Sequence, residues 1–209
     1  MQATAQALAQ WSLRLWKVSD PGARDSFGAG GFNMVRTEIF KRLGGMTAMR
    51  MEVVEDLSLA SMVKRAGGPS IVALGPGLVN IRWIEGAFGI VGNMEKNGLA
   101  IFRYRLGLAL AACLGLAIQV TLPLAAIVAG GWTTVAGMLT YAGIALTFHA
   151  NRRLNQVPAM AAIFFAPAAA IIGYGLLRSV VLTLGRDGVV WRGTHYPMNE
   201  LRRNAVRWR

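Results

Sequence analysis

The stretch LGLALAACLGLAIQVTLPLAAIVAG, residues 106–130, decides the class of fold to which this chain belongs. It contains no charged side chain, and the charge-free run continues as far as Asn151. A second run, Leu154–Leu177, is also free of Asp, Glu, Lys and Arg. Because about 20 apolar residues are enough for a helix to cross a bilayer, these runs predict a membrane-spanning helical region. Pro123 is expected to kink its first helix.

The distribution of basic residues favours a membrane surface over nucleic acid as the partner of this chain. The formal net charge is +12, and 54% of the residues are hydrophobic while 15% are charged. Lys and Arg beside membrane spans typically face the cytoplasm and the lipid headgroups. Such residues flank the apolar runs: Arg103, Arg105, Arg152, Arg153, Arg186, Arg192, Arg202, Arg203, Arg207 and Arg209. We therefore expect membrane lipids, and no nucleic acid, as partners.

The pattern divides the chain into four segments. They are residues 1–83, an amphipathic interface helix over 84–105, a transmembrane region of two to three spans over 106–184, and a basic tail over 185–209 that holds the motif WRGTHY. Within the transmembrane region, helices are expected over 106–130, 132–149 and 156–184. A third full crossing would place the basic tail outside, so either this stretch bends at Pro167 or the tail departs from the positive-inside preference. The single cysteine, Cys113, excludes a disulfide framework within the chain.

The segment VVEDLSLASMVKRAGG, residues 53–68, predicts one short helix with an acidic pair at its start. Glu55 and Asp56 stand in the first turn, basic residues stand in the last turn, and glycine follows. This distribution matches the helix dipole and the usual stop signal. Two interpretations of Asp56 are open at this point. It either caps the helix by accepting backbone N–H bonds, or is held there as an ionised general base.

A glycine-rich segment, SFGAGGFNMVR, residues 26–36, precedes the acidic pair. Its glycines allow close approach of the backbone, but the spacing fits neither GxGxxG nor a Walker motif. By itself it indicates either ligand contact or a tight turn. Around it we expect a helix over 2–18 and short strands over 70–73 and 78–83, which would need a further sheet to pair with.

Taken in order, these segments resemble the C-terminal half of membrane-bound family 2 glycosyltransferases. The matching pieces are GAGGFNMVR, EIFKRLGGM, VVEDLSLASMVKRAG, MEKN, the apolar stretches and VVWRGTHY, between residues 20 and 203. The hopanoid- and carotenoid-associated subgroup is most similar, and ceramide glucosyltransferases are more distantly so. The resemblance implies a mainly α-helical chain: the C-terminal part of a GT-A α/β catalytic domain, followed by transmembrane helices. It also implies a bacterial inner membrane, with the catalytic part in the cytoplasm.

The resemblance implies inverting transfer of a sugar from a nucleotide-sugar to a lipid hydroxyl. In such enzymes the Asp of the late acidic pair deprotonates the acceptor, which here is Asp56 with Glu55 beside it. The family's glycine segment lines the sugar pocket. The resemblance therefore implies these substrate-binding residues, from the glycine segment, an Arg-Trp pair and the tail motif: Gly30, Gly31, Arg36, Arg82, Trp83, Trp191, Arg192 and Tyr196.

Two departures from the family pattern concern the rest of the site. No Asp-x-Asp motif occurs, so ligands for the Mg²⁺ or Mn²⁺ of the full family enzyme are not expected in this chain. Only the sequence NIRW, residues 80–83, is left of the family's QxxRW motif. We therefore expect a partial enzyme that needs a separate N-terminal half and is inactive alone. The alternative is a non-catalytic membrane protein, either a remnant or a partner-binding subunit. A small transporter is less favoured, because Arg178 is the only charge in the apolar stretches.

Overall fold

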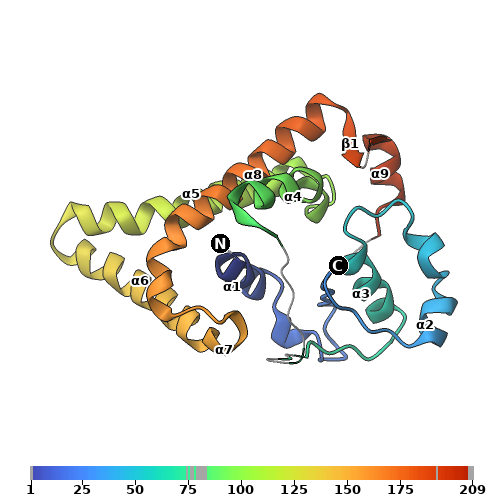
Figure 1. Ribbon diagram of the computed structural model, residues 1–209, viewed down its shortest axis with the longest axis horizontal. Helices are drawn as coiled ribbons and strands as arrows, with labels where there is room; N and C mark the ends of the chain where they lie inside the picture. The colour runs from blue at the N-terminus through green and yellow to red at the C-terminus, as the bar shows by residue number, and fades with distance from the viewer. Residues whose placement is uncertain (1, 74, 76–77, 79–83, 192, 207–209) are drawn as a thin grey trace. The chain divides into compact units, whose positions relative to one another are not determined.

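The computed structural model describes residues 2–73, 75, 78, 84–191 and 193–206, and it is mainly helical, as predicted (Figure 1). The α-helices are α1 (Gln2–Ser12), α2 (Thr37–Arg42), α3 (Glu55–Arg65), α4 (Gly86–Ile101), α5 (Leu106–Ala129), α6 (Trp132–Ala150), α7 (Arg152–Asn155), α8 (Phe165–Gly185) and α9 (Met198–Asn204). The 3-10 helices are η1 (Leu15–Lys17), η2 (Gly45–Met49) and η3 (Ala159–Phe164), and the strands are β1 (Gly188–Trp191) and β2 (Thr194–Pro197).

The chain forms two compact units. The first, which we call the helical unit, comprises Met1–Leu8 and Gly75–Val181. The second, the α3 unit, comprises Ala9–Leu74 and Leu182–Arg209. The helices α1 and α8 each run from one unit into the other. Segments that precede and follow the apolar helices in sequence therefore share the α3 unit, and each unit is described by itself below.

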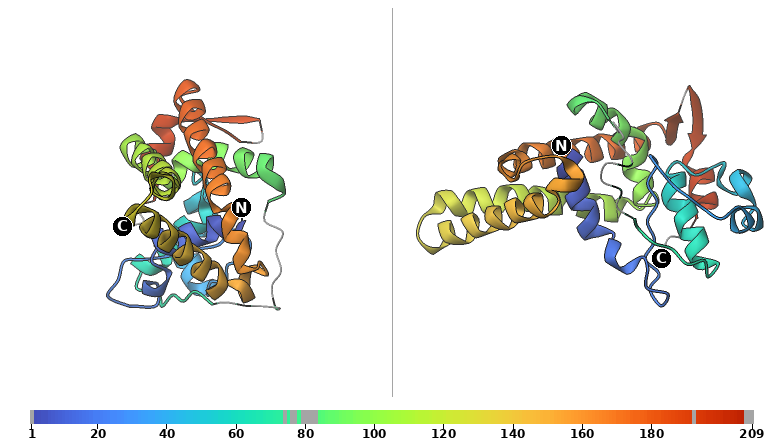
Figure 2. Two further views of the ribbon diagram at one scale, coloured as in Figure 1. Left: turned by 90° about the vertical axis from the view of Figure 1, so that its left-hand side faces the viewer. Right: turned by 60° about the horizontal axis from the view of Figure 1, so that its bottom comes forward.

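In the helical unit, α5 and α6 pack side by side as a hairpin (Figure 2). The Gly130–Gly131 turn joins them with φ angles of 84° and 61°, a backbone conformation that favours glycine. The helices make a close contact at Gly137, where an added Cβ would lie 2.6 Å from the carbonyl oxygen of Pro123. Thr134 donates a 3.0 Å hydrogen bond from Oγ1 to the carbonyl of Ile127. Small residues at the contact and satisfied hydroxyls are typical of helix pairs in apolar surroundings.

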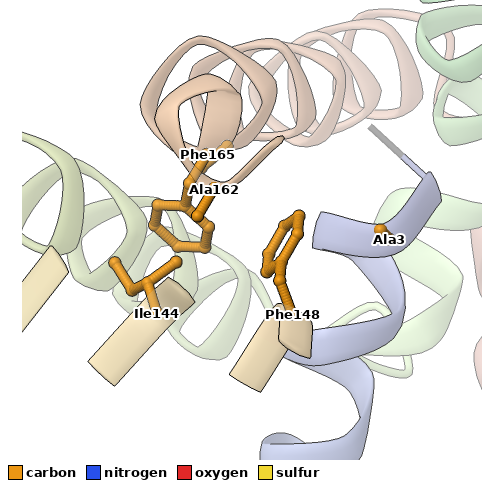
Figure 3. Close-up of a cluster of buried hydrophobic side chains, with 6 residues drawn as sticks. Ala3, Ile144, Phe148, Ala162 and Phe165 are labelled. Atoms are coloured by element: carbon orange, nitrogen blue, oxygen red, sulfur yellow. The ribbon is translucent and has the colours of Figure 1, made fainter. Parts of the chain in front are cut away.

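The core of the helical unit lies where α1, α6, η3 and α8 meet (Figure 3). Phe148 of α6 and Phe165 of α8 are buried there, and Ala3 of α1 belongs to the same cluster. The remaining buried members are Ile144, Ala162 and Ala169. Burial of a large apolar side chain stabilises a fold by about 1.5–3 kcal/mol. The two phenylalanines therefore tie the first turns of α1 to the apolar helices.

The helix α4 is joined to α8 by a close contact at Gly98. An added Cβ on Gly98 would lie 2.7 Å from Cβ of Ser179. The Ser179 hydroxyl accepts a hydrogen bond from the backbone N–H of Leu99 and donates one to the carbonyl of Glu95, both at 3.0 Å. Beside it, the Arg178 guanidinium lies 3.5 Å from the Glu95 carboxylate. The helix expected before the first apolar run is therefore present as α4 and attached to α8 through its backbone.

Among the residues that the structure describes, two helical stretches are long and apolar enough to cross a membrane: α5, and the stretch Ala159–Gly185 that combines η3 with α8. Leu114 and Leu122 of α5 are 62% and 63% exposed, which suits a helix surrounded by lipid. Between these stretches lies α6, an apolar helix of 19 residues. The last stretch changes from 3-10 to α-helix at Phe165, and Pro167 falls in the first turn of α8, where a missing N–H costs least.

In the α3 unit, the two strands pair as an antiparallel hairpin. Val189 lies opposite Tyr196, and α9, which carries the buried residues Met198 and Leu201, packs against both strands. In the described part of the chain, this hairpin forms a two-stranded sheet of its own. The expected GT-A α/β domain therefore stays a prediction.

Two local predictions in the N-terminal third are wrong. Residues 70–73 form no strand, because the described chain offers them no neighbouring strand. The strand expected over 78–83 lies outside the described residues apart from Leu78. The helix expected over 2–18 ends at Ser12. It ends there because Arg14 adopts a left-handed conformation, with φ 43°, and its guanidinium pairs with Asp25.

Candidate active site

The helix α3 begins at Glu55, where the sequence predicts, and carries both acids in its first turn. Val53 and Val54 are buried and fix the chain that enters the helix. Val54 is the N-cap residue, and no side chain caps the helix. Asp56 is therefore not the N-cap, although its Oδ1 accepts a 2.8 Å hydrogen bond from the backbone N–H of Leu57.

The glycine-rich segment packs directly on Asp56. At Gly28, an added Cβ would overlap the carbonyl oxygen of Asp56. At Gly30, it would lie 3.2 Å from Oδ2 of the Asp56 carboxylate. A residue with a side chain would therefore push the segment away from α3. The structure brings together two segments that lie more than twenty positions apart in the sequence.

Burial raises the pKa of Asp56 above its ordinary value and is the largest influence on it. The backbone N–H of Leu57 lowers the pKa, the neighbouring charge of Glu55 raises it, and the N–H of Gly30 lowers it. The net direction is upward, because withdrawal from water disfavours the ionised form. A carboxylate with a raised pKa takes up a proton more readily than an exposed one, and a general base needs this property.

Two basic side chains fix the chain that leads into the glycine-rich segment. Arg14 binds the buried Asp25 through two hydrogen bonds of 2.9 and 2.7 Å. Lys64, in the last turn of α3, donates to the carbonyls of Val18 and Asp20 at 2.6 and 2.8 Å. Charged donors and acceptors make stronger hydrogen bonds than neutral ones. These bonds therefore hold the glycine-rich segment and α3 in a fixed relation.

Apart from the half-buried Val35, the residues from Gly31 to Arg36 are exposed. Arg36 is the N-cap residue of α2, with its side chain in solvent. Between these two predicted binding residues, Phe32 is 57% exposed and Met34 is 84% exposed. The segment next to Gly30 thus presents two large apolar side chains, followed by a cation.

Trp191 and Tyr196, predicted from the tail motif, lie together on the β1–β2 hairpin. Their ring centroids are 6.4 Å apart, with an angle of 41° between the rings. They belong to the same compact unit as Asp56. The other predicted binding residues, Arg82, Trp83 and Arg192, lie outside the described residues.

Glu52 is a residue that the sequence does not single out, and its carboxylate accepts hydrogen bonds through both oxygens. Oε2 accepts a 2.6 Å hydrogen bond from the hydroxyl of Ser58, and Oε1 accepts a hydrogen bond from the backbone N–H of Val206. Ser58 is fully buried in α3. A serine at an otherwise apolar position hints at a local partner. A backbone donor 154 residues further along leaves no such signal.

The side chains in the described ranges do not offer the donor set for the divalent metal expected of the full family enzyme. Among these ranges, no three His, Cys, Asp or Glu side chains come close enough together to hold an ion. Mg²⁺ and similar cations are held by several oxygen ligands. We therefore derive no metal-dependent step for the residues of this chain.

Comparison with known protein families, with curated proteins and with solved structures gives no match to this chain. The candidate site consists of a half-buried Asp56 with a raised pKa and an exposed Glu55 beside it. The backbone of Gly28 lies against the carbonyl of Asp56, and that of Gly30 lies against its carboxylate.

Proposed function

We propose that this chain is the acceptor-binding part of a membrane glycosyltransferase, which transfers a sugar from a nucleotide-sugar to a lipid hydroxyl with inversion. The observation that carries the proposal is the half-buried carboxylate of Asp56, with its raised pKa, beside the glycine-rich segment. The order of motifs that resembles family 2 glycosyltransferases supports the same assignment.

The proposed chemical role of Asp56 is that of general base. The acceptor hydroxyl loses its proton to the Asp56 carboxylate as its oxygen attacks the anomeric carbon. The bond to the nucleotide breaks on the opposite face of the sugar, so the configuration inverts, as in other single displacements at a glycosidic carbon. The N–H groups of Leu57 and Gly30 orient the carboxylate for this transfer.

Exposed apolar residues that follow the glycine-rich segment in sequence support a lipid acceptor. Phe32 and Met34 are exposed directly after the glycines that contact Asp56. The same chain carries two helices apolar enough to cross a membrane. A hydroxyl on an apolar lipid fits such a surface better than a soluble sugar does.

Donor binding is assigned to a separate half. The proposal places the nucleotide and any divalent metal on the N-terminal half that the resemblance to family 2 glycosyltransferases implies. The chain is then expected to transfer sugar only when that half is present. Transfer by the purified chain alone would refute the need for a second half.

The decisive experiment measures transfer of labelled sugar to extracted polar lipid in nanodiscs. The chain is assayed alone and with the product of an adjacent reading frame that encodes a nucleotide-binding half. Asp56→Asn should lower kcat by about 10²–10⁴-fold, the usual contribution of general acid–base catalysis. Glu38→Gln, which changes an exposed acid in the first turn of α2, is the matched control and should leave kcat unchanged.

Two results would contradict this function. If Asp56→Asn retains full transfer, Asp56 is not the base. If no combination of donor, lipid and second half gives transfer, the non-catalytic membrane protein becomes the better assignment.

A further inference from the structure

The Glu52 carboxylate connects two parts of the α3 unit that are far apart in sequence. One oxygen accepts from the Ser58 hydroxyl within α3, at 2.6 Å. The other accepts from the backbone N–H of Val206, which follows α9 near the C-terminus. The backbone N–H of Glu52 itself donates to the carbonyl of Met49 at 2.8 Å. The backbone of Glu52 is therefore held by Met49, while its carboxylate binds donors from Ser58 and Val206.

These bonds bracket Asp56 along the chain. Before it, Val53 and Val54 are buried and keep the helix start in the interior. After it, Ser58 is fully buried and bonded to Glu52, which stands on the far side of the acidic pair. The only residues between Glu52 and Ser58 are thus the two valines, the two acids and Leu57. A loop closed over so few residues restricts the backbone that carries Asp56.

We propose that Glu52 is a positioning residue for Asp56 and that it makes the C-terminal segment part of the catalytic machinery. The effect of Glu52 on catalysis rests on the proposed function, whereas its effect on the backbone at Asp56 does not. The Val206 N–H holds one oxygen of Glu52, and the other oxygen holds Ser58. Together they press the start of α3 against Gly28 and Gly30.

The chemistry at position 52 calls for a carboxylate. Two donors bind different oxygens of one side chain, and an ionised carboxylate has acceptor sites on both oxygens. Hydrogen bonds to such a charge are shorter and stronger than neutral ones, which agrees with the 2.6 Å contact to Ser58. Glutamine would keep one oxygen acceptor and lose the other, and alanine would lose both.

A proline substitution tests the hydrogen bond that the Val206 N–H donates to Glu52. Val206→Pro removes the backbone donor together with the valine side chain, whereas Val206→Ala removes the side chain but keeps the donor and serves as the matched control. The preceding residue, Ala205, has φ −63° and ψ 124°, which is the extended conformation that a residue before proline prefers. The residue before the proline therefore needs no change of backbone conformation.

The first measurement is hydrogen exchange of the purified chain in nanodiscs, read by mass spectrometry on peptides that cover residues 52–60. We expect Val206→Pro to raise exchange in the first turn of α3 at least about threefold over Val206→Ala, because that turn loses a constraint on its opening. Glu52→Ala should do the same by a route that involves no proline. Unchanged exchange in both variants, or a uniform rise across the whole α3 unit, would overturn the proposal.

The second measurement is the kinetic consequence, in the reconstituted transfer assay. Glu52→Ala should lower kcat by about 10- to 100-fold, with the KM for the lipid acceptor unchanged, because a displaced base slows chemistry rather than binding. Glu52→Gln should recover part of that loss. A rise in KM with unchanged kcat would contradict a positioning role.

The two measurements separate this inference from the proposed function. If exchange in the first turn of α3 rises but no variant, including the parent, transfers sugar, then the Glu52 link stands and the glycosyltransferase assignment fails. If the parent transfers sugar and exchange is unaffected, the assignment stands and the link fails.

Discussion

Glycine brings the backbone into close contact in both units, with different results. In the helical unit, Gly98 admits Ser179, whose hydroxyl donates one hydrogen bond and accepts another. In the α3 unit, Gly28 and Gly30 press against Asp56, whose pKa is raised by burial. The first contact is fully satisfied packing, and the second leaves a carboxylate able to take up a proton. A close backbone contact at a glycine does not by itself indicate a functional site. The contact indicates one when the group that it buries can take up a proton, as Asp56 can.

Among the close glycine contacts, the largest effect is expected at Gly28, where the added atom meets backbone that cannot rotate away. Gly28→Ala should lower the free energy of unfolding by about 1–3 kcal/mol and reduce kcat about 100-fold, because the segment must retreat from Asp56. The control is Gly22→Ala, whose Cβ would make an ordinary 3.5 Å contact with Asp20. Thermal unfolding in detergent, followed by circular dichroism, measures the difference. Equal melting temperatures for the two variants would show that the contact at Gly28 is not tight.

A smaller effect is expected at Gly98, where the added atom meets a side chain. Gly98→Ala should cost about 1–2 kcal/mol, because α4 and α8 must separate by a fraction of an ångström. Gly92→Ala is the control in the same helix, since nothing lies within 4 Å of its added Cβ. That variant should be neutral or more stable, because alanine favours helix over glycine by up to about 1 kcal/mol. If both variants are stabilised alike, the close contact with Ser179 is refuted.

The same two units show what a sequence can predict. The helices α3 and α5 start at the predicted residues, Glu55 and Leu106, because charge patterns and apolar runs act within a helix. The sequence carries no local pattern that predicts the contact between the glycine-rich segment and Asp56; the resemblance to family 2 glycosyltransferases implies only that both belong to one site. The physical cause of the contact, a missing Cβ against a carbonyl, becomes visible only in three dimensions.

The errors share one cause, which is dependence on distant residues. The first helix ends early because Arg14 reaches Asp25, eleven positions on. Residues 70–73 form no strand because a strand needs a neighbour that the described chain does not supply. Glu52 was missed because one of its partners is a backbone N–H, which carries no sequence signature. Local sequence patterns predict single helices. The hydrogen bonds and contacts that position Asp56 instead join segments that are distant in sequence.

The smallest effect is expected from removing the charge of Glu55. Burial and this charge both raise the pKa of Asp56, and the substitution distinguishes their contributions. The active, ionised base exists above the pKa of Asp56, so transfer should be lost as the pH falls through it. Because the charge of Glu55 raises this pKa, Glu55→Gln should move the acid limb of kcat to lower pH. Glu38→Gln, remote in sequence and exposed, should leave the limb in place.

Salt sharpens the same measurement. Glu55 is exposed, so its influence on Asp56 is screened by ions, with a Debye length of about 10 Å at 0.1 M salt. The difference between the acid limbs of Glu55→Gln and the parent should therefore shrink as salt rises from about 0.01 M to about 1 M. The contribution of burial should persist, since it depends on exclusion of water from Asp56 rather than on a distant charge. If the parent's acid limb falls to that of an ordinary carboxylate at high salt, Glu55 rather than the glycine-rich segment sets the base strength of Asp56.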